Sequence, residues 1–146
     1  MQTVATFAID PNPEPSGEAD SRLLRNGQDT GTIVPGIVLE AQLAHHDEHL
    51  LFLTHDIPFE EQLEICLLDK SDRLVDRVWL AGANTTGNFR NLETDPGDSA
   101  AFDFFGTRKW RVTVLNRSKL FLPILDRHLG VHRKLGFSGR LLVQPI

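Results

Sequence analysis

The chain has 146 residues, of which 40% are hydrophobic and 24% are charged, and its formal net charge is −5. This composition is typical of a single soluble globular domain, and no stretch approaches the ~20 apolar residues of a membrane-spanning helix. A single cysteine excludes an intrachain disulfide. Because residues 1–15 also lack the basic and apolar regions of a signal peptide, we expect a cytoplasmic protein.

The N-terminal residues are predicted to form a short strand and a flexible tether. Thr3–Ile9 alternates weakly between apolar and polar residues, as an edge strand would. Asp10–Gly31 is rich in Pro, Gly and polar residues, a composition that favours a mobile segment. We therefore divide the chain into residues 1–31, an edge strand with its tether, and residues 32–146, a β-sandwich domain. The tether would let the strand pair at a distance, within its own chain or with a neighbouring one.

The region from Thr32 to Thr54 is predicted to contain two paired strands. Apolar residues fall on one parity of the first strand, which indicates a half-buried strand; they are Ile37, Leu39, Ala41 and Leu43. Leu50–Thr54 supplies a partner across a short polar reversal. A helix over residues 38–53 is the alternative, because Glu, Ala, Gln and Leu are good helix formers. The regular alternation favours the strands.

Two further hairpins are predicted along the chain. Gln62–Leu80 contains two alternating stretches, and the Asp and Ser residues between them can bond nearby backbone groups and so reverse the chain. Ala100–Asn116 repeats this organisation. Its two halves carry aromatic and β-branched residues that can form cross-strand pairs, with Phe102 in the first half and Val112 in the second.

One region favours a helix. In Lys119–Phe137, Pro123 suits the first position of a helix and Gly130 suits its end. Ser138–Val143 then alternates as a final strand. The predicted fold is therefore mainly all-β, an antiparallel β-sandwich or jelly roll with one short helix near the C-terminus.

Four histidines, His45, His46, His49 and His55, lie close together in the sequence. His45, Glu48 and His49 match the H-x-x-E-H pattern of some zinc peptidases, but the chemistry of that pattern requires a helix. At a hairpin tip the spacing loses this meaning, although a tip can still gather imidazoles around Zn²⁺ or Ni²⁺. We interpret the cluster as a solvated polar turn. The alternative is a metal-dependent enzyme or metal sensor that uses these four histidines.

The charge is unevenly distributed along the chain. From Gly106 to Ile146, nine Lys and Arg residues stand against one acid, a net charge of +8, whereas the rest of the chain carries −13. Halves of opposite sign indicate partner binding, although strands of opposite charge can also pair within one fold. The candidate interaction residues are Arg108, Lys109, Arg117, Lys119, Arg127, Arg133 and Lys134.

No stretch matches a phosphate-binding loop or a nucleophile elbow, so we predict no catalytic residue and no cofactor. We predict a non-catalytic protein-interaction or structural domain that self-associates or joins a larger assembly, away from membranes. Nucleic-acid binding through the basic C-terminal segment is a second alternative, but a pI of about 5.6 argues against it. The sequence identifies neither the partner nor the number of subunits.

Overall fold

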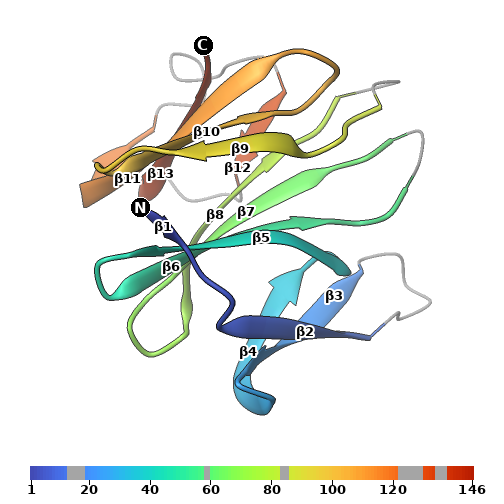
Figure 1. Cartoon of the computed structure of the whole chain (residues 1–146), viewed down its shortest axis with the longest axis vertical. Coiled ribbons are helices and arrows are strands. Elements are labelled where there is room, and N and C mark those ends of the chain that lie inside the picture. Colours follow the sequence, from blue (N-terminus) through green and yellow to red (C-terminus); the bar gives the residue numbers. More distant parts are fainter. Residues whose placement is uncertain (13–18, 58–59, 83–85, 122–129, 134–137) are drawn as a thin grey trace.

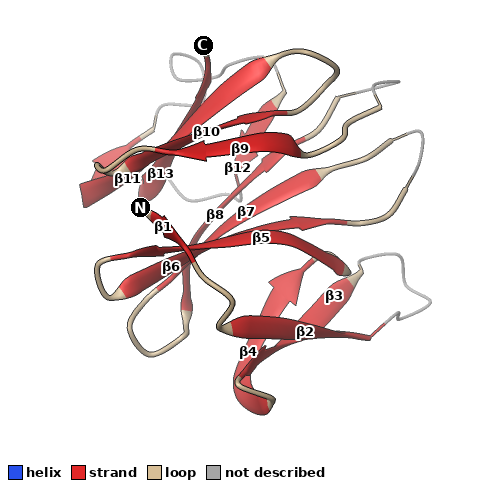
Figure 2. Ribbon diagram, viewed as in Figure 1, coloured by secondary structure: helices blue, strands red, loops and turns tan. Residues whose placement is uncertain are grey.

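The computed structural model describes residues 1–12, 19–57, 60–82, 86–121, 130–133 and 138–146. Over these ranges the chain forms thirteen β-strands in three antiparallel sheets, and it forms no helix (Figure 1, Figure 2). This part of the chain accordingly contains no helix that is long and apolar enough to cross a membrane. The all-β class predicted from the alternating sequence pattern is therefore confirmed.

The three sheets have six, four and three strands. The six-stranded sheet has the order β1 (Gln2–Thr3), β5 (Val38–His45), β6 (Glu48–Thr54), β7 (Leu63–Leu68), β8 (Leu74–Leu80) and β12 (Val131–Arg133). The four-stranded sheet has the order β13 (Ser138–Pro145), β11 (Lys109–Leu120), β10 (Ser99–Asp103) and β9 (Arg90–Thr94). The three-stranded sheet has the order β2 (Phe7–Asn12), β3 (Asp20–Arg25) and β4 (Gln28–Pro35).

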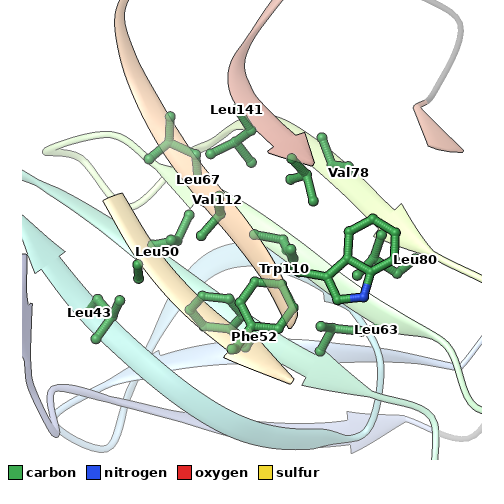
Figure 3. Packing of buried hydrophobic residues seen from close by; sticks show 14 of the residues in the cluster. Leu43, Leu50, Phe52, Leu63, Leu67, Val78, Leu80, Trp110, Val112 and Leu141 are labelled. Atoms are coloured by element: carbon green, nitrogen blue, oxygen red, sulfur yellow. The ribbon is translucent and has the colours of Figure 1, made fainter. Parts of the chain in front are cut away.

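β7 lies inside the six-stranded sheet, and all six of its residues are buried. Successive side chains of a strand point to opposite faces of its sheet. Ile65 belongs to the main core cluster together with Trp110 of the four-stranded sheet. Figure 3 shows Trp110 among other members of this cluster. Cys66, the next residue, belongs to a smaller cluster with Leu23 of the three-stranded sheet. The six-stranded sheet is therefore buried on both faces around β7, and this explains why both parities of this strand are so apolar.

The main core cluster joins strands β5 to β8 with β10, β11 and β13. Its buried members are Leu43, Leu50, Phe52, Leu63, Ile65, Leu67, Val78, Leu80, Ala100, Phe102, Phe104, Trp110, Val112, Val114, Leu141 and Val143. Full burial of one large apolar side chain contributes about 1.5–3 kcal/mol, so this larger of the two clusters is a major source of stability. The indole Nε1 of Trp110 also donates to the backbone oxygen of Phe104 over 3.1 Å, so its polar atom is satisfied inside the core.

The three hairpins predicted from the alternation are confirmed. Gln62–Leu80 contains β7 and β8, which pair in antiparallel register, and Ala100–Asn116 lies within the β10–β11 pair. Residues 38–53 form the β5–β6 hairpin and not the alternative helix. Each hairpin combines period-two alternation with a polar reversal, and both signals are local in the sequence.

The prediction of a mobile tether over Asp10–Gly31 was wrong for the residues that the structure describes. β2, β3 and β4 pair there into the three-stranded sheet, and Leu23 is completely buried. Asn26 and Gly27 both adopt left-handed backbone angles, which a two-residue hairpin turn favours. This Asn-Gly turn signal outweighs the Pro-rich composition that precedes it, and the boundary predicted after Gly31 falls inside β4.

The N-terminal strand pairs within its own chain. Gln2 and Thr3 pair with Ala44 and Leu43 of β5. The side chain of Gln42 then accepts hydrogen bonds from the backbone of Thr6 and Phe7 over 2.9 and 2.7 Å. Phe7 itself begins β2, so the predicted single strand is divided between two sheets.

The helix predicted near the C-terminus falls largely on residues 122–129 and 134–137, which lie outside the described residues. Lys119 and Leu120, at the start of that predicted region, belong to β11. Within Ser138–Val143 the predicted final strand is confirmed, because β13 covers this range and pairs with β11.

Candidate metal centre

The β5–β6 hairpin brings two histidines together. His45, the last residue of β5, pairs with Glu48, the first residue of β6, and only His46 and Asp47 lie between them. This short loop requires a left-handed backbone at His46, whose φ is 53°. A non-glycine residue in this region is uncommon, and here it places the His46 ring 4.5 Å from the His45 ring between centroids.

The third side chain comes from the four-stranded sheet. Asp98 lies in the turn between β9 and β10, where the Asp95 carboxylate accepts the backbone N–H of Gly97 over 2.8 Å. The backbone oxygen of Asp98 accepts the N–H of Val114 over 2.9 Å, and this contact fixes the turn against β11. The carboxylate is thereby directed to the histidines of the other sheet.

The three side chains form a compact group of potential ligand atoms. Oδ1 of Asp98 lies 2.8 Å from Nε2 of His45 and 3.9 Å from Nε2 of His46. One ligand atom from each residue lies within 4.8 Å of the other two. Ligand atoms at the usual 2.0–2.2 Å from a tetrahedral zinc ion are themselves about 3.3–3.6 Å apart. The observed separations therefore need only small side-chain rotations to hold such an ion.

The group lies at the protein surface with one buried side. The His45 side chain is 4% exposed, whereas those of Asp98 and His46 are 42% and 76% exposed. The hydrogen bond from His45 and the neighbouring imidazoles lower the pKa of Asp98, so this carboxylate is ionised at neutral pH. An ion would therefore be bound by one anionic carboxylate and two imidazoles, with buried His45 on its inner side and solvent on its outer side.

A second carboxylate stands behind His45. Nδ1 of His45 is buried and has no hydrogen-bond partner in the described structure, and Oε2 of Glu48 lies 3.9 Å from it. Metal-bound histidines commonly donate their other ring N–H to a carboxylate, which fixes the orientation of the ring. Glu48 is in the position to accept this hydrogen bond after a small rotation.

Glu48 is itself held by Arg140 of β13. The Arg140 guanidinium donates to both carboxylate oxygens of Glu48, with Nη2 2.8 Å from Oε2, and its Nε donates to the backbone oxygen of Leu115 over 2.8 Å. Asp76 of β8 accepts the backbone N–H groups of Arg140 and Leu141 over 2.7 and 2.8 Å. Because the guanidinium holds both carboxylate oxygens of Glu48, this side chain can make only a small rotation toward His45.

The other two histidines of the sequence cluster lie elsewhere. His49 pairs with Ala44 in the hairpin and therefore points to the opposite face of the sheet from His45. On that face its ring packs edge-on against the Phe7 ring, with the two ring centroids 5.0 Å apart. Burial lowers the pKa of His49, and the nearby Arg25 guanidinium lowers it further. The structure thus brings together two of the four predicted histidines.

His55 lies beyond the far end of β6, next to a buried carboxylate. Its Nε2 is 3.2 Å from Oε1 of Glu64, whose side chain is fully buried. Arg77 donates to both oxygens of Glu64 over 2.8 and 2.9 Å. Burial opposes ionisation of Glu64, but the hydrogen bonds from His55 and Arg77 outweigh it, so the pKa of Glu64 is lowered. This group is an ion pair between neighbouring strands of one sheet and not a metal cluster.

Five of the seven predicted basic interaction residues lie in the described part of the chain, and two of them, Lys119 and Arg133, lie over the same Phe121 ring, 5.7 and 3.9 Å from its centroid. Lys109 pairs with Glu93 over 2.8 Å, and Arg133 pairs with Asp76 over 3.2 Å. The Arg108 guanidinium lies over the Trp110 ring, 5.6 Å from its centroid. Arg117 and Lys119 are exposed on β11. Arg127 and Lys134 lie outside the described residues.

Sequence reasoning included Glu48 only as part of the H-x-x-E-H pattern, and it did not connect Asp98 or Arg140 with the histidines. Asp98 belongs to an Asp-Pro-Gly-Asp turn, and aspartate is common in turns for backbone reasons alone. Its contact with His45 joins residues that are 53 positions apart. No local spacing could have indicated it.

Comparison with known proteins gives no relative: no family model, no curated protein and no solved structure matches this chain.

Proposed function

We propose that this protein binds a divalent transition-metal ion through His45, His46 and Asp98. The observation that carries the proposal is the meeting of two imidazoles from one sheet with a carboxylate from another, with ligand atoms within 4.8 Å of one another. The unsatisfied Nδ1 of His45 beside Glu48 supports it, because a second carboxylate behind a histidine ligand is the usual arrangement around bound metals.

The donor set favours one class of ion. Imidazole nitrogen suits Zn²⁺, Cu²⁺, Ni²⁺ and iron, whereas Mg²⁺ and Ca²⁺ prefer a shell made of oxygen atoms. The ion would replace the hydrogen bond between His45 and Asp98, and the proton of His45 would move to Nδ1 and face Glu48. Because His45 and Asp98 come from different sheets, the bound ion would also fasten the β5–β6 hairpin to the β9–β10 turn.

The test is calorimetric titration of the chelator-treated full chain with Zn²⁺. We expect saturable binding of one ion, lost in Asp98→Asn and in His46→Asn. Asparagine is chosen to replace His46 because it tolerates the left-handed backbone at this residue and removes the imidazole. Asp47→Asn is the matched control, since it changes a carboxylate in the same turn but outside the cluster, and it should leave binding unchanged. Binding that survives both site variants would overturn the proposal.

We also infer that the six-stranded and four-stranded sheets pack face to face as a β-sandwich, the arrangement expected from the sequence. The main core cluster supports this inference because it contains side chains of both sheets. Phe52 and Phe102, for example, have ring centroids 5.5 Å apart in an edge-to-face arrangement. Nuclear Overhauser contacts between these two rings in solution would test the packing.

A second candidate function is self-association through the end of β11. Arg117 and Lys119 are exposed there, and Leu120, which is 60% exposed, follows Lys119 in the strand and points to the opposite face. Exposed cations favour a partner with an acidic surface, and the part of a second copy outside residues 106–146 carries a net charge of −13.

A further inference from the structure

We propose that the metal ion held by His45, His46 and Asp98 keeps a coordination position open to solvent, and that this position binds a carboxylate ligand. The inference rests on the proposed metal binding and goes beyond it, because it assigns a ligand class to the site. A metal that only fastens the two sheets would not need an open position.

Within the described part of the chain, the candidate metal centre has too few protein ligands to fill the coordination shell of a metal ion. Among the residues that the structure describes, the group around Asp98 contains three potential ligands and no fourth His, Cys, Asp or Glu. The nearest additional carboxylate, Glu48, is turned toward Nδ1 of His45 and is engaged by Arg140. Structural zinc sites use four protein ligands, whereas sites with three keep the next position for water or substrate.

The exposure of the ligands gives the direction of the open position. His45 closes the inner side of the group with a side chain that is 4% exposed. Asp98 and His46 are 42% and 76% exposed and stand at the rim. The position left by the three side chains therefore faces water, and an exogenous molecule can reach it without any movement of the core.

Charge balance decides which ligand is favoured. A divalent ion with one carboxylate and two neutral imidazoles has a net charge of +1. The nearby Glu48 does not change this balance, because its charge is matched by the Arg140 guanidinium. An anionic oxygen donor therefore gains more from the open position than a neutral one, and a carboxylate supplies such a donor to these metals.

The test uses Co²⁺, whose visible absorption reports its ligands, and acetate as the carboxylate probe. The chelator-treated full chain is loaded with Co²⁺ and titrated with sodium acetate at constant ionic strength, with sodium perchlorate as the control anion. We expect the Co²⁺ absorption to shift with acetate, to saturate and to return on dialysis, and perchlorate to have no effect. His46→Asn should remove the Co²⁺ spectrum, and Asp47→Asn should show the same acetate response as the unchanged protein.

Two failures are distinguishable in this experiment. Absence of a protein-bound Co²⁺ spectrum would overturn both the metal site and the inference. A bound Co²⁺ spectrum that is lost in His46→Asn but does not respond to acetate would retain the metal site and overturn the open position. Sedimentation of the Co²⁺-loaded protein identifies the source of the carboxylate: dimers dissociated by acetate indicate a side chain of a second copy, and monomers throughout indicate a free small molecule.

Discussion

Nε2 of His45 lies 2.8 Å from Oδ1 of Asp98, although 53 residues separate them and they belong to different sheets. This contact fixes the position of the β5–β6 hairpin tip against the β9–β10 turn. It also holds a nitrogen and a carboxylate oxygen close enough together that small side-chain rotations would let both bind one ion, beside the exposed imidazole of His46. One hydrogen bond thus joins the two turns and lies within the candidate metal centre.

Metal binding should raise the thermal stability of the protein. Zinc at one hundred times its dissociation constant would stabilise the folded state by about 2.7 kcal/mol, or roughly 5–10 °C in a chain of this size. The increase should disappear in Asp98→Asn and persist in Asp47→Asn, as measured by circular dichroism with and without chelator. An equal increase in both variants would place the ion elsewhere.

The three-stranded sheet should be an integral part of the fold. Leu23 is completely buried in the smaller core cluster, so Leu23→Ala should lower the free energy of unfolding by about 2–5 kcal/mol. Leu24→Ala is the matched control, because Leu24 is the next residue of β3 and is only partly buried; it should cost less than half as much. Chemical denaturation measures both values. Equal small effects would mean that residues 20–35 form the tether predicted from composition.

The buried carboxylate of Glu64 depends on Arg77. Arg77→Met would leave a fully buried negative charge with its main cation removed, at a cost of about 3–5 kcal/mol. Adding Glu64→Gln to this variant should recover part of the loss, since the uncompensated charge is then gone. Denaturant unfolding of the two single variants and the double variant gives the coupling energy.

The same carboxylate should make stability depend on pH. Because the pKa of Glu64 is lowered in the folded state, its contribution is fully present above the ordinary carboxyl pKa of 4.5. The contribution is lost as pH falls through the lower folded pKa. Unfolding measured between about pH 6 and pH 3 should therefore show a steeper loss for the unchanged protein than for the Glu64→Gln, Arg77→Met variant. Parallel curves would contradict this assignment.

His49 should titrate below an ordinary histidine. Burial, helped by Arg25, lowers its pKa from 6.5, so its neutral form is favoured in the folded state. The stability linked to His49 is then complete above pH 6.5 and decreases as the pH falls. Nuclear magnetic resonance of the imidazole protons gives the pKa directly, and Arg25→Met should raise it. A pKa at or above 6.5 in the unchanged protein would disprove the buried position.

Self-association should respond to salt. Electrostatic attraction between exposed groups is screened over about 8–10 Å at physiological ionic strength, so a dimer docked through Arg117 and Lys119 should weaken as salt rises. Arg117→Glu should shift sedimentation toward the monomer at low salt. Arg111→Glu makes the same charge change at another exposed position of β11 and should have less effect. A monomer at high concentration and low salt would exclude this docking mode.

The sequence by itself determined the elements whose signals are local. Alternation over Gln62–Leu80 predicted one hairpin, and over Val38–Thr54 it favoured a second against a helical alternative, because side-chain direction in a strand has a period of two. It also placed the histidine cluster at a hairpin tip. The Asn26–Gly27 turn was a local signal of the same kind, and its neighbouring Pro-rich composition obscured it.

The tertiary structure decided which side chains meet. His49 is close to His45 in the sequence, yet strand alternation turns it to the opposite face of the six-stranded sheet. Asp98 is distant in the sequence, yet the packing of two sheets through their shared core brings it within hydrogen-bond distance of His45. Local preferences act over a few residues, whereas a ligand group is assembled by the register and packing of strands that the chain brings together only when it folds.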